Sequence, residues 1–191
     1  MSPTHRNTKT LSIRPSPIQG YGVFANRDIH KGEMITLMRG TILTVPEVQK
    51  LYLNGQTRTT CDTLQIAEQK YVLLDPLHNS INHSCNPNAG MRKIRSLVAL
   101  RNIRKGEEVT FDYSIVEWTP RNYTAYDPHD WPLRCDCHSP RCRKLIKCFP
   151  YVPKALQNKY VRSGMIQDFI LRKLASPRNE TRCDVCENMK E

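Results

Sequence analysis

The sequence predicts a mainly β fold that ends in a helical segment. Before residue 115, the apolar residues form short runs between turns and follow no sustained helical period. Thirteen prolines and eight glycines in 191 residues also favour many short elements over long helices. After Pro153 the apolar residues recur at helical spacing. This order is typical of small sheets joined by tight turns and followed by helices.

Short strands are expected through the first part of the chain. Pro15, Pro17 and Gly20 mark an early turn, Gly40 a break, and 28–32 and 104–107 further turns. The expected strands are residues 11–13, 22–25, 33–37, 41–44, 61–66, 71–74, 97–100 and 109–113.

One helix is expected early and two at the C-terminal end. Residues 46–54 form the first, because Pro46 suits a helix start and Gly55 a helix end. Gly164 can cap the first of the two later helices. Their apolar faces consist of Leu156, Tyr160, Ile166, Phe169, Ile170 and Leu174. The aromatic-rich connection 115–134 is long for a compact domain, which favours a functional loop.

A length of 191 residues suits one domain, with room for a small appendage. The net charge of +11 predicts attraction to nucleic acid, nucleoprotein or acidic protein patches, although a basic protein need bind none of them. Residues 1–10 are polar and basic, and lack the apolar core of a secretory signal. Apolar runs such as 97–100 are too short to span a bilayer. We therefore expect a soluble, intracellular protein with no membrane partner.

The segment Asn82-His83-Ser84-Cys85-Asn86-Pro87-Asn88 is an unusually polar loop. Asn, Ser and Pro favour turns because their side chains compete for backbone hydrogen bonds or remove a donor. Such a segment is either a plain surface turn or a functional loop, and its composition alone does not decide between them.

The cysteines point to a metal. Eight of them in a reducing compartment suit metal ligands or buried thiols better than disulfides. Cys135, Cys137 and Cys142 lie close enough in sequence to hold one tetrahedral zinc, but such a site needs a fourth ligand. Cys148 is the local candidate and Cys85 the distant one.

The other cysteines and the histidines give weaker signals. Cys183 and Cys186 could form half of a second site, with Cys61 among the few remaining partners. The histidines outside the polar loop show no ligand spacing and are expected at the surface; they are His5, His30, His78, His129 and His138.

Two further motifs are ambiguous when taken singly. The turn at Gly20-Tyr21-Gly22 allows a hairpin or a close approach of backbone to a ligand. The segment 106–113 predicts a strand that ends in Tyr113, whose hydroxyl either lines a site or anchors the edge of the core.

Along the chain the four motifs follow the order Gly20–Gly22, Asn82–Asn88, 106–113 and Cys135–Cys142. In this order they resemble a SET-domain protein-lysine methyltransferase with a post-SET zinc motif, and the resemblance covers about residues 11–147. It implies a β-clip-like fold of small curved sheets, with the segments around Asn82 and Tyr113 threaded as a pseudoknot. The compact form with a helical tail looks similar to small stand-alone SET proteins.

The resemblance implies S-adenosyl-L-methionine as cofactor and Tyr113 as the catalytic residue beside the substrate lysine. The cofactor would lie against Gly20, Tyr21 and Gly22, and Asn82 and His83 would hold its amino-acid and adenine parts. Trp131 is expected beside the adenine or simply in the core. One structural zinc would be bound by Cys85, Cys135, Cys137 and Cys142. Cys85, and not Cys148, would then be the fourth ligand.

At one position of the expected substrate channel, this sequence departs from the family pattern. Many relatives carry a tyrosine two residues before the glycine that matches Gly40, and Met38 stands there in this chain. The number of methyl groups added therefore stays open, and Tyr71 is a candidate to supply a hydroxyl from a neighbouring strand.

The expected function is methylation of lysine in a protein substrate, such as a histone, another chromatin protein or a nucleic-acid-bound basic protein. The alternative is a non-catalytic basic module that binds nucleoprotein. The location implied is the nucleus with its chromatin, or the cytoplasm and nucleoid. The expected segments are a disordered basic tail (1–10), the SET domain (11–114), a connecting loop with the zinc motif (115–147), helices (148–177) and a mobile charged tail (178–191).

Overall fold

The computed structural model describes residues 8–56, 62–118 and 133–176. The basic and charged tails fall mostly outside these ranges. The predictions for Cys61, Trp131, Cys183 and Cys186 also lie outside the described residues. No helix in the described ranges is long and apolar enough to cross a membrane.

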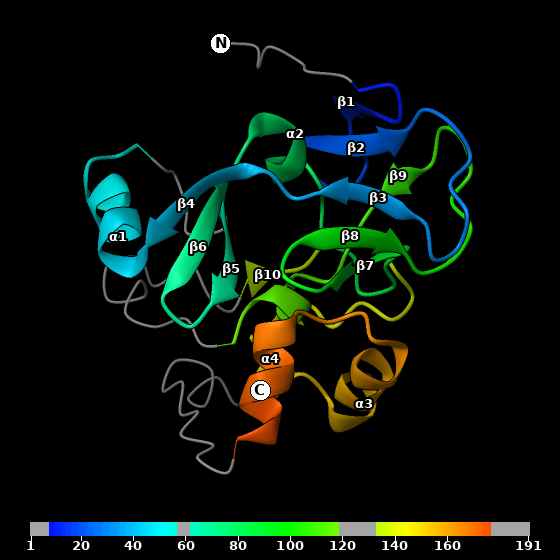
Figure 1. Ribbon diagram of the computed structural model, residues 1–191. Helices are drawn as coiled ribbons and strands as arrows, with labels where there is room; N and C mark the ends of the chain where they lie inside the picture. The colour runs from blue at the N-terminus through cyan, green and yellow to red at the C-terminus, as the bar shows by residue number, and fades with distance from the viewer. Residues whose placement is uncertain (1–7, 57–61, 119–132, 177–191) are drawn as a thin grey trace.

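Three small antiparallel sheets form most of the domain (Figure 1). The first has the order β1-β2-β9, the second β3-β8-β7 and the third β4-β6-β5. Their strands are β1 (Leu11–Pro15), β2 (Tyr21–Ala25), β3 (Met34–Leu37), β4 (Gly40–Thr44), β5 (Thr63–Ala67), β6 (Lys70–Leu74), β7 (Ala89–Arg92), β8 (Ser96–Ala99) and β9 (Glu108–Val109). A further pair, β10 (Leu133–Arg134) and β11 (Leu145–Ile146), lies near the cysteines. The prediction of a mainly β fold is confirmed.

The helices are short and lie around the sheets. They are α1 (Val45–Leu53), α2 (Pro76–Asn79), α3 (Lys154–Ser163) and α4 (Asp168–Ala175), with 3-10 turns at Tyr113–Val116 and Phe149–Tyr151. In Figure 1, α3 and α4 lie beside the β7–β8 sheet, on the side away from β1 and β2. The amide of Asp168 donates to the carbonyl of Lys93 in the β7–β8 turn, which attaches the start of α4 to that sheet.

Local chemistry explains the helix ends. Asp75 caps α2 by accepting a hydrogen bond from the amide of His78, and Pro76 occupies the first helical position. Gly164 ends α3 with a left-handed φ of 62°, as its position in the sequence predicts. The sequence patterns missed α2 and β7, each of four residues.

The predicted strand 109–113 is wrong beyond its first residue. Only Glu108–Val109 pairs as a strand, and Tyr113 begins a 3-10 turn. The cause is Asp112, whose buried carboxylate accepts a hydrogen bond from the amide of Ser114 and so turns the chain. Ile166 likewise precedes α4 instead of lying within it.

One continuous core connects the sheets and the C-terminal helices. Residues from β1, β2 and β8 pack with Phe149, Tyr160 and Ile170 in the same cluster. The rings of Trp118 and Phe149 stack with their centroids 6.5 Å apart. The C-terminal helices are therefore part of the domain core and not a separate appendage.

Candidate functional site

The polar loop 82–88 runs beside the segment around Phe111. His83 pairs with Phe111 as an isolated parallel bridge. The amide of Ser84 donates to the Phe111 carbonyl over 3.1 Å, and the Phe111 amide donates to the Asn82 carbonyl over 3.3 Å. Two segments far apart in sequence are thus fixed side by side.

The side chains at the two ends of this loop anchor it. The amide nitrogen of Asn82 lies within 2.8 to 3.2 Å of four acceptors: Glu108 Oε1, the Tyr21 carbonyl, Ser16 Oγ and the Gln19 carbonyl. At the other end, the buried Asn88 side chain donates to the Glu108 carbonyl and accepts from the Thr110 amide.

Gly20 and Gly22 play different parts in the neighbouring turn. Gly20 has a left-handed φ of 48°, with no atom near the position of a Cβ. Gly22 is buried, and a Cβ there would lie 2.1 Å from Glu108 Oε1. The close approach at Gly22 is therefore to a carboxylate of the protein itself.

A large cavity opens between this turn, the polar loop and the cysteine segment. Its volume is about 790 Å³. Its wall consists of Ile18, Gln19, Gly20, Tyr21, Asp62, Asn79, Ser80, Asn82, His83, Tyr113, Leu133, Arg134, Cys135, Asp136 and Ile146. This large cavity is thus lined by the backbone of a glycine turn and by polar side chains from several elements.

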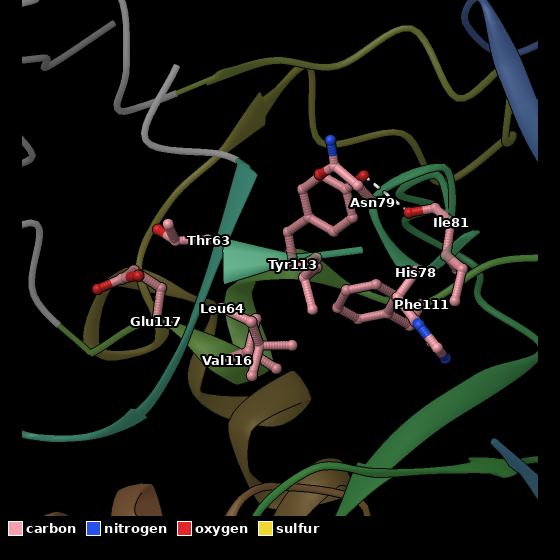
Figure 2. Close-up of a pocket in the computed structure, with 10 residues that line it drawn as sticks. Thr63, Leu64, His78, Asn79, Ile81, Phe111, Tyr113, Val116 and Glu117 are labelled. Carbon is pink, nitrogen blue, oxygen red and sulfur yellow. Dashed lines mark hydrogen bonds between the residues drawn. The ribbon is translucent and has the colours of Figure 1, made fainter. Parts of the chain in front are cut away.

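A second, narrow cavity of about 30 Å³ adjoins Tyr113 on the inner side (Figure 2). Half of its lining residues are apolar, namely Leu64, Leu74, Ile81, Phe111 and Val116; the others are Thr63, His78, Asn79, Tyr113 and Glu117. Asn79 and Tyr113 line both cavities. Figure 2 shows Thr63 and Glu117 on the side of this cavity away from Asn79 and Ile81.

Several contacts fix Tyr113 between the two cavities. Its hydroxyl donates a hydrogen bond of 2.9 Å to the carbonyl of Ile81. Its amide donates to Nδ1 of His83 over 3.1 Å. Its ring lies against Phe111 and edge-on to His83, with centroids 5.0 and 5.4 Å apart. The phenol oxygen is thus held at a defined point between the two spaces.

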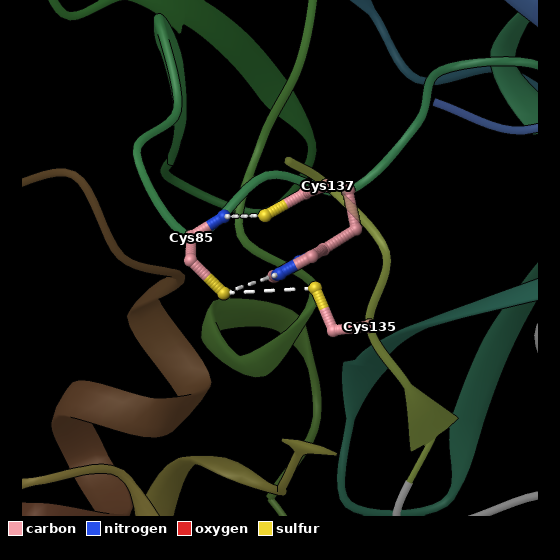
Figure 3. A group of neighbouring side chains, drawn as sticks. Cys85, Cys135 and Cys137 are labelled. Atoms are coloured by element: carbon pink, nitrogen blue, oxygen red, sulfur yellow. Dashed lines mark hydrogen bonds between the residues drawn. The ribbon is translucent and has the colours of Figure 1, made fainter. Parts of the chain in front are cut away.

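The thiols of Cys85, Cys135 and Cys137 converge next to this site (Figure 3). Their sulfur atoms and a ring nitrogen of His83 all lie within 4.8 Å of one another. The sulfurs of Cys85 and Cys135 are 3.7 Å apart. A tetrahedral zinc with Zn–S bonds of about 2.3 Å would place two sulfurs about 3.8 Å apart, so the observed spacing suits that ion.

Comparison with known proteins places this architecture in a family. A model of the SET domain matches residues 20–114. The chain belongs to the SET-domain family. The match includes the glycine turn, the polar loop and Tyr113, so three of the four motifs lie within it, whereas the cysteine motif at 135–142 lies after it.

Two curated relatives are similar to this chain over most of its length. A variant-silencing SET domain-containing protein of Plasmodium falciparum is 33% identical over 150 residues, covering 70% of this chain and 6% of that protein. A histone-lysine N-methyltransferase of Debaryomyces hansenii, named as specific for lysine 36 of H3, is 29% identical over 148 residues, covering 71% of this chain and 19% of that protein. The chain thus spans less than a fifth of the length of either relative.

Among solved structures, a humanized mutant of the Chaetomium thermophilum Polycomb Repressive Complex 2 aligns with a TM-score of 0.49 and 24% identity. The alignment covers 58% of this chain and 15% of that one.

The SET domain brings together most of the predicted cofactor residues. Gly20, Tyr21, Asn82, His83 and Tyr113 all line the large cavity. Gly22 lies behind this surface, against Glu108, and is not among the lining residues.

The histidine of the SET-domain loop has both ring nitrogens engaged. Burial lowers the pKa of His83 to about 4, against the opposing effect of Asp112, so the ring is neutral near pH 7. Because Nδ1 accepts from the Tyr113 amide, the ring proton is assigned to Nε2, 3.2 Å from the sulfur of Cys85. A protonated Nε2 donates to a thiolate and cannot also ligate a metal.

Cys142 lies beside the converging thiols. It packs against their cluster, and its thiol contacts the Cys135 carbonyl at 3.2 Å. Backbone amides point at the sulfurs, from Arg143 to Cys85 and from Lys144 to Cys142. Burial raises the pKa of Cys137, but amide donors from Cys85 and Ser139 outweigh it and lower that pKa to about 7. These donors suit a thiolate at Cys137, whereas burial raises the pKa of Cys85 and of Cys135.

The sequence patterns missed several residues of the narrow cavity. His78, expected at the surface, is only 3% exposed and lines this cavity, whereas His30 and His138 are exposed as predicted. Its ring contacts Asp75 Oδ1 at 2.7 Å and Thr36 Oγ1 at 2.9 Å. The Asp75-Pro76 cap signal could have located the turn that buries it.

The two other channel residues considered from the sequence lie elsewhere. Met38 is fully buried in the main core. Tyr71 packs with Val48 in a separate cluster beneath α1. Neither is among the described residues that line the narrow cavity, so neither supplies a hydroxyl to it.

Proposed function

We propose that this SET domain transfers methyl groups to the ε-amine of lysine in a protein substrate, with S-adenosylmethionine as donor. The observation that carries this proposal is the position of Tyr113. It stands between a cavity large enough for a cofactor and a small cavity of about 30 Å³, which we propose receives the lysine side chain. A reaction between two such ligands would take place beside its hydroxyl.

The large cavity fits the proposed cofactor. Its volume of about 790 Å³ lies within the range of small-molecule sites. When bound, S-adenosylmethionine supplies a methyl group already activated on a sulfonium. The turn at Gly20 and Tyr21 presents backbone to the ligand, and Asn82 holds that turn through the Tyr21 carbonyl. We propose that Asn82 and His83 position this surface as well as contact the ligand.

The narrow cavity suits an uncharged lysine amine. A free lysine has a pKa near 10.4, so it must lose a proton before attack. The apolar half of the lining, with Leu64, Phe111 and Val116, disfavours the ammonium form. Because the Tyr113 proton is directed at the Ile81 carbonyl, the phenol oxygen presents acceptor lone pairs that can bind an amine N–H. Tyr113 thus orients the amine for an in-line reaction.

We propose one structural zinc bound by Cys85, Cys135, Cys137 and Cys142. The spacing of the sulfurs and the amide donors directed at them support this site, and the ring proton assigned to His83 favours Cys142 as the fourth ligand. Such an ion would fix the polar loop against the segment that carries β10 and β11.

The substrate we propose is a histone or another basic chromatin protein. The relative from Debaryomyces hansenii is named as a histone-lysine methyltransferase, and a net charge of +11 suits a protein that works near nucleic acid. The same observations support a location at chromatin.

Labelled S-adenosylmethionine and purified histones or nucleosomes test the reaction. The Tyr113→Phe variant should lose about 100-fold in kcat but bind the cofactor as well as the wild type, because only the hydroxyl that holds the amine is removed. Tyr71→Phe, buried beneath α1 away from both cavities, is the matched control. A chain that binds nucleosomes but neither binds nor uses the cofactor would support the non-catalytic module instead.

A further inference from the structure

The carboxylate of Asp112 is fully buried and joins three distant parts of the chain. Its Oδ1 atom lies 2.6 Å from Nη2 of Arg143, which follows the last cysteine of the zinc motif. The same oxygen accepts from the amide of Ser114 over 3.0 Å. Its Oδ2 atom accepts from the hydroxyl of Tyr160, on α3, over 2.8 Å.

This carboxylate fixes the turn that begins with Tyr113. The bond from the Ser114 amide caps the 3-10 turn Tyr113–Val116 and sets the direction in which the Tyr113 side chain leaves the backbone. The carboxylate also lies 3.6 Å from Nδ1 of His83, the atom that receives the Tyr113 amide. A rotation of Asp112 would therefore disturb both backbone contacts that place Tyr113.

Each oxygen of Asp112 has its own side-chain donor. Arg143 supplies the charge and holds Oδ1, and Tyr160 holds Oδ2. A buried carboxylate that loses a donor turns toward another one, because an unpaired buried oxygen is costly. The hydroxyl of Tyr160 thus prevents Asp112 from rotating about its terminal bond.

We propose that Tyr160 is a positioning residue for Tyr113, acting through Asp112. The C-terminal helix α3 then contributes to the active site without touching either cavity. Gln157, one turn earlier, holds the start of α3 by donating to the carbonyls of Phe149, Pro150 and Val152. The catalytic part of this proposal rests on the function proposed above, whereas the structural part does not.

The Tyr160→Phe variant of the full chain tests the proposal, because it removes one hydroxyl and keeps the ring. Ser163→Ala is the matched control: it removes a hydroxyl from the same helix, one that donates to the Tyr160 carbonyl and not to Asp112. Isotope labelling of the tyrosine rings gives NMR signals for each tyrosine. The signals that disappear in Tyr113→Phe are those of Tyr113. Zinc content and thermal melting show whether each variant is folded.

We expect Tyr160→Phe to shift or broaden the Tyr113 ring signals and to lower kcat about tenfold per folded molecule, with the peptide KM and cofactor Kd changed less than about threefold. Ser163→Ala should change none of these. Asp112→Asn, which keeps the side-chain size, should shift the same signals. Unchanged Tyr113 signals in Tyr160→Phe would overturn the proposal.

The spectra decide this point even if the wild type transfers no methyl group. That result would refute the proposed function, while the Tyr113 signals would still show whether Tyr160 positions that ring. A variant that only melts earlier, with normal Tyr113 signals and normal kcat per folded molecule, would reduce Tyr160 to a structural role and contradict the proposal.

Discussion

The side-chain nitrogen Nδ2 of Asn82 lies 2.8 Å from Oε1 of Glu108, and the same carboxylate fills the space beside Gly22. Both oxygens of Glu108 also accept from the hydroxyl of Ser16, at 2.9 Å each. The Glu108 carboxylate therefore connects the glycine turn and the polar loop to β9. The shape of the proposed cofactor cavity therefore depends on Glu108 as much as on the residues that line the cavity.

Glu108→Ala should lower cofactor affinity about tenfold, because the turn at Gly20 and Tyr21 loses its support while the lining residues stay the same. Isothermal titration calorimetry with S-adenosylmethionine measures the change. Glu68→Ala, which removes an exposed carboxylate paired with Lys173, is the control and should bind normally. Equal affinity in the two variants would show that the turn holds its shape without Glu108.

The fourth zinc ligand can be identified by substitution. Cys142→Ser should lower the zinc content below the expected one ion per chain, whereas Cys148→Ser and His83→Gln should retain it, because Cys142 completes a four-thiol set. Metal analysis of the purified variants provides the measurement. Loss of zinc in His83→Gln but not in Cys142→Ser would instead support the set of His83 and three cysteines that converge within 4.8 Å.

Removing the zinc should also weaken cofactor binding. Cys135 lines the large cavity and belongs to the proposed metal site, so the two sites share a wall. Cys85→Ser should therefore reduce both the zinc content and the affinity for S-adenosylmethionine, and calorimetry on the zinc-depleted chain should show the same loss. Normal affinity in a zinc-free but folded chain would separate the two sites.

Residues with special local chemistry could be located from the sequence. A glycine with left-handed φ at Gly20, a polar loop at Asn82 and clustered thiols each leave a pattern in the sequence, and the structure brings them to one place. Contacts set by the packing of distant elements leave no such pattern. Asp112 and Tyr160 are 48 residues apart, and neither spacing nor composition indicates that they meet.

The narrow cavity illustrates the same limit. Asn79 and Glu117 belong to a four-residue helix and to the end of a 3-10 turn, and neither lies in a motif. They face the cavity only because β5 and β6 pack against these elements. Tertiary placement, not local preference, gives them their position.

Glu117→Gln should raise KM for a lysine peptide severalfold and leave kcat within about twofold. Glu117 is 8% exposed and lines the narrow cavity on the side away from Asn79. Its carboxylate would attract the lysine ammonium as it enters, before the amine loses its proton beside Tyr113. Steady-state kinetics with varied peptide concentration separates the two constants. Glu47→Gln, on α1, is the control, and an unchanged KM in Glu117→Gln would exclude this attraction.

Stability should fall in mildly acidic solution because of His78. Burial lowers the pKa of His78 below 6.5, although the hydrogen bond and charge of Asp75 oppose the shift; the charge of Arg39 lowers it further. Below pH 6.5 the unfolded chain gains a proton at this ring that the folded chain does not, so the free energy of unfolding decreases as the pH falls. Above pH 6.5 both states are neutral and the contribution is complete.

Urea unfolding between pH 7.5 and 5.0 measures this dependence. His78→Gln removes the titrating ring, so its stability should change less over that range, although the variant is less stable at pH 7.5 because the contacts to Asp75 and Thr36 are altered. His83 is also buried and has a lowered pKa. Its contribution to the pH dependence of stability is the same in the wild type and in His78→Gln, so it cancels when the two are compared. His30→Gln, at an exposed position, should follow the wild-type curve, and the same curve for His78→Gln would contradict the role of His78.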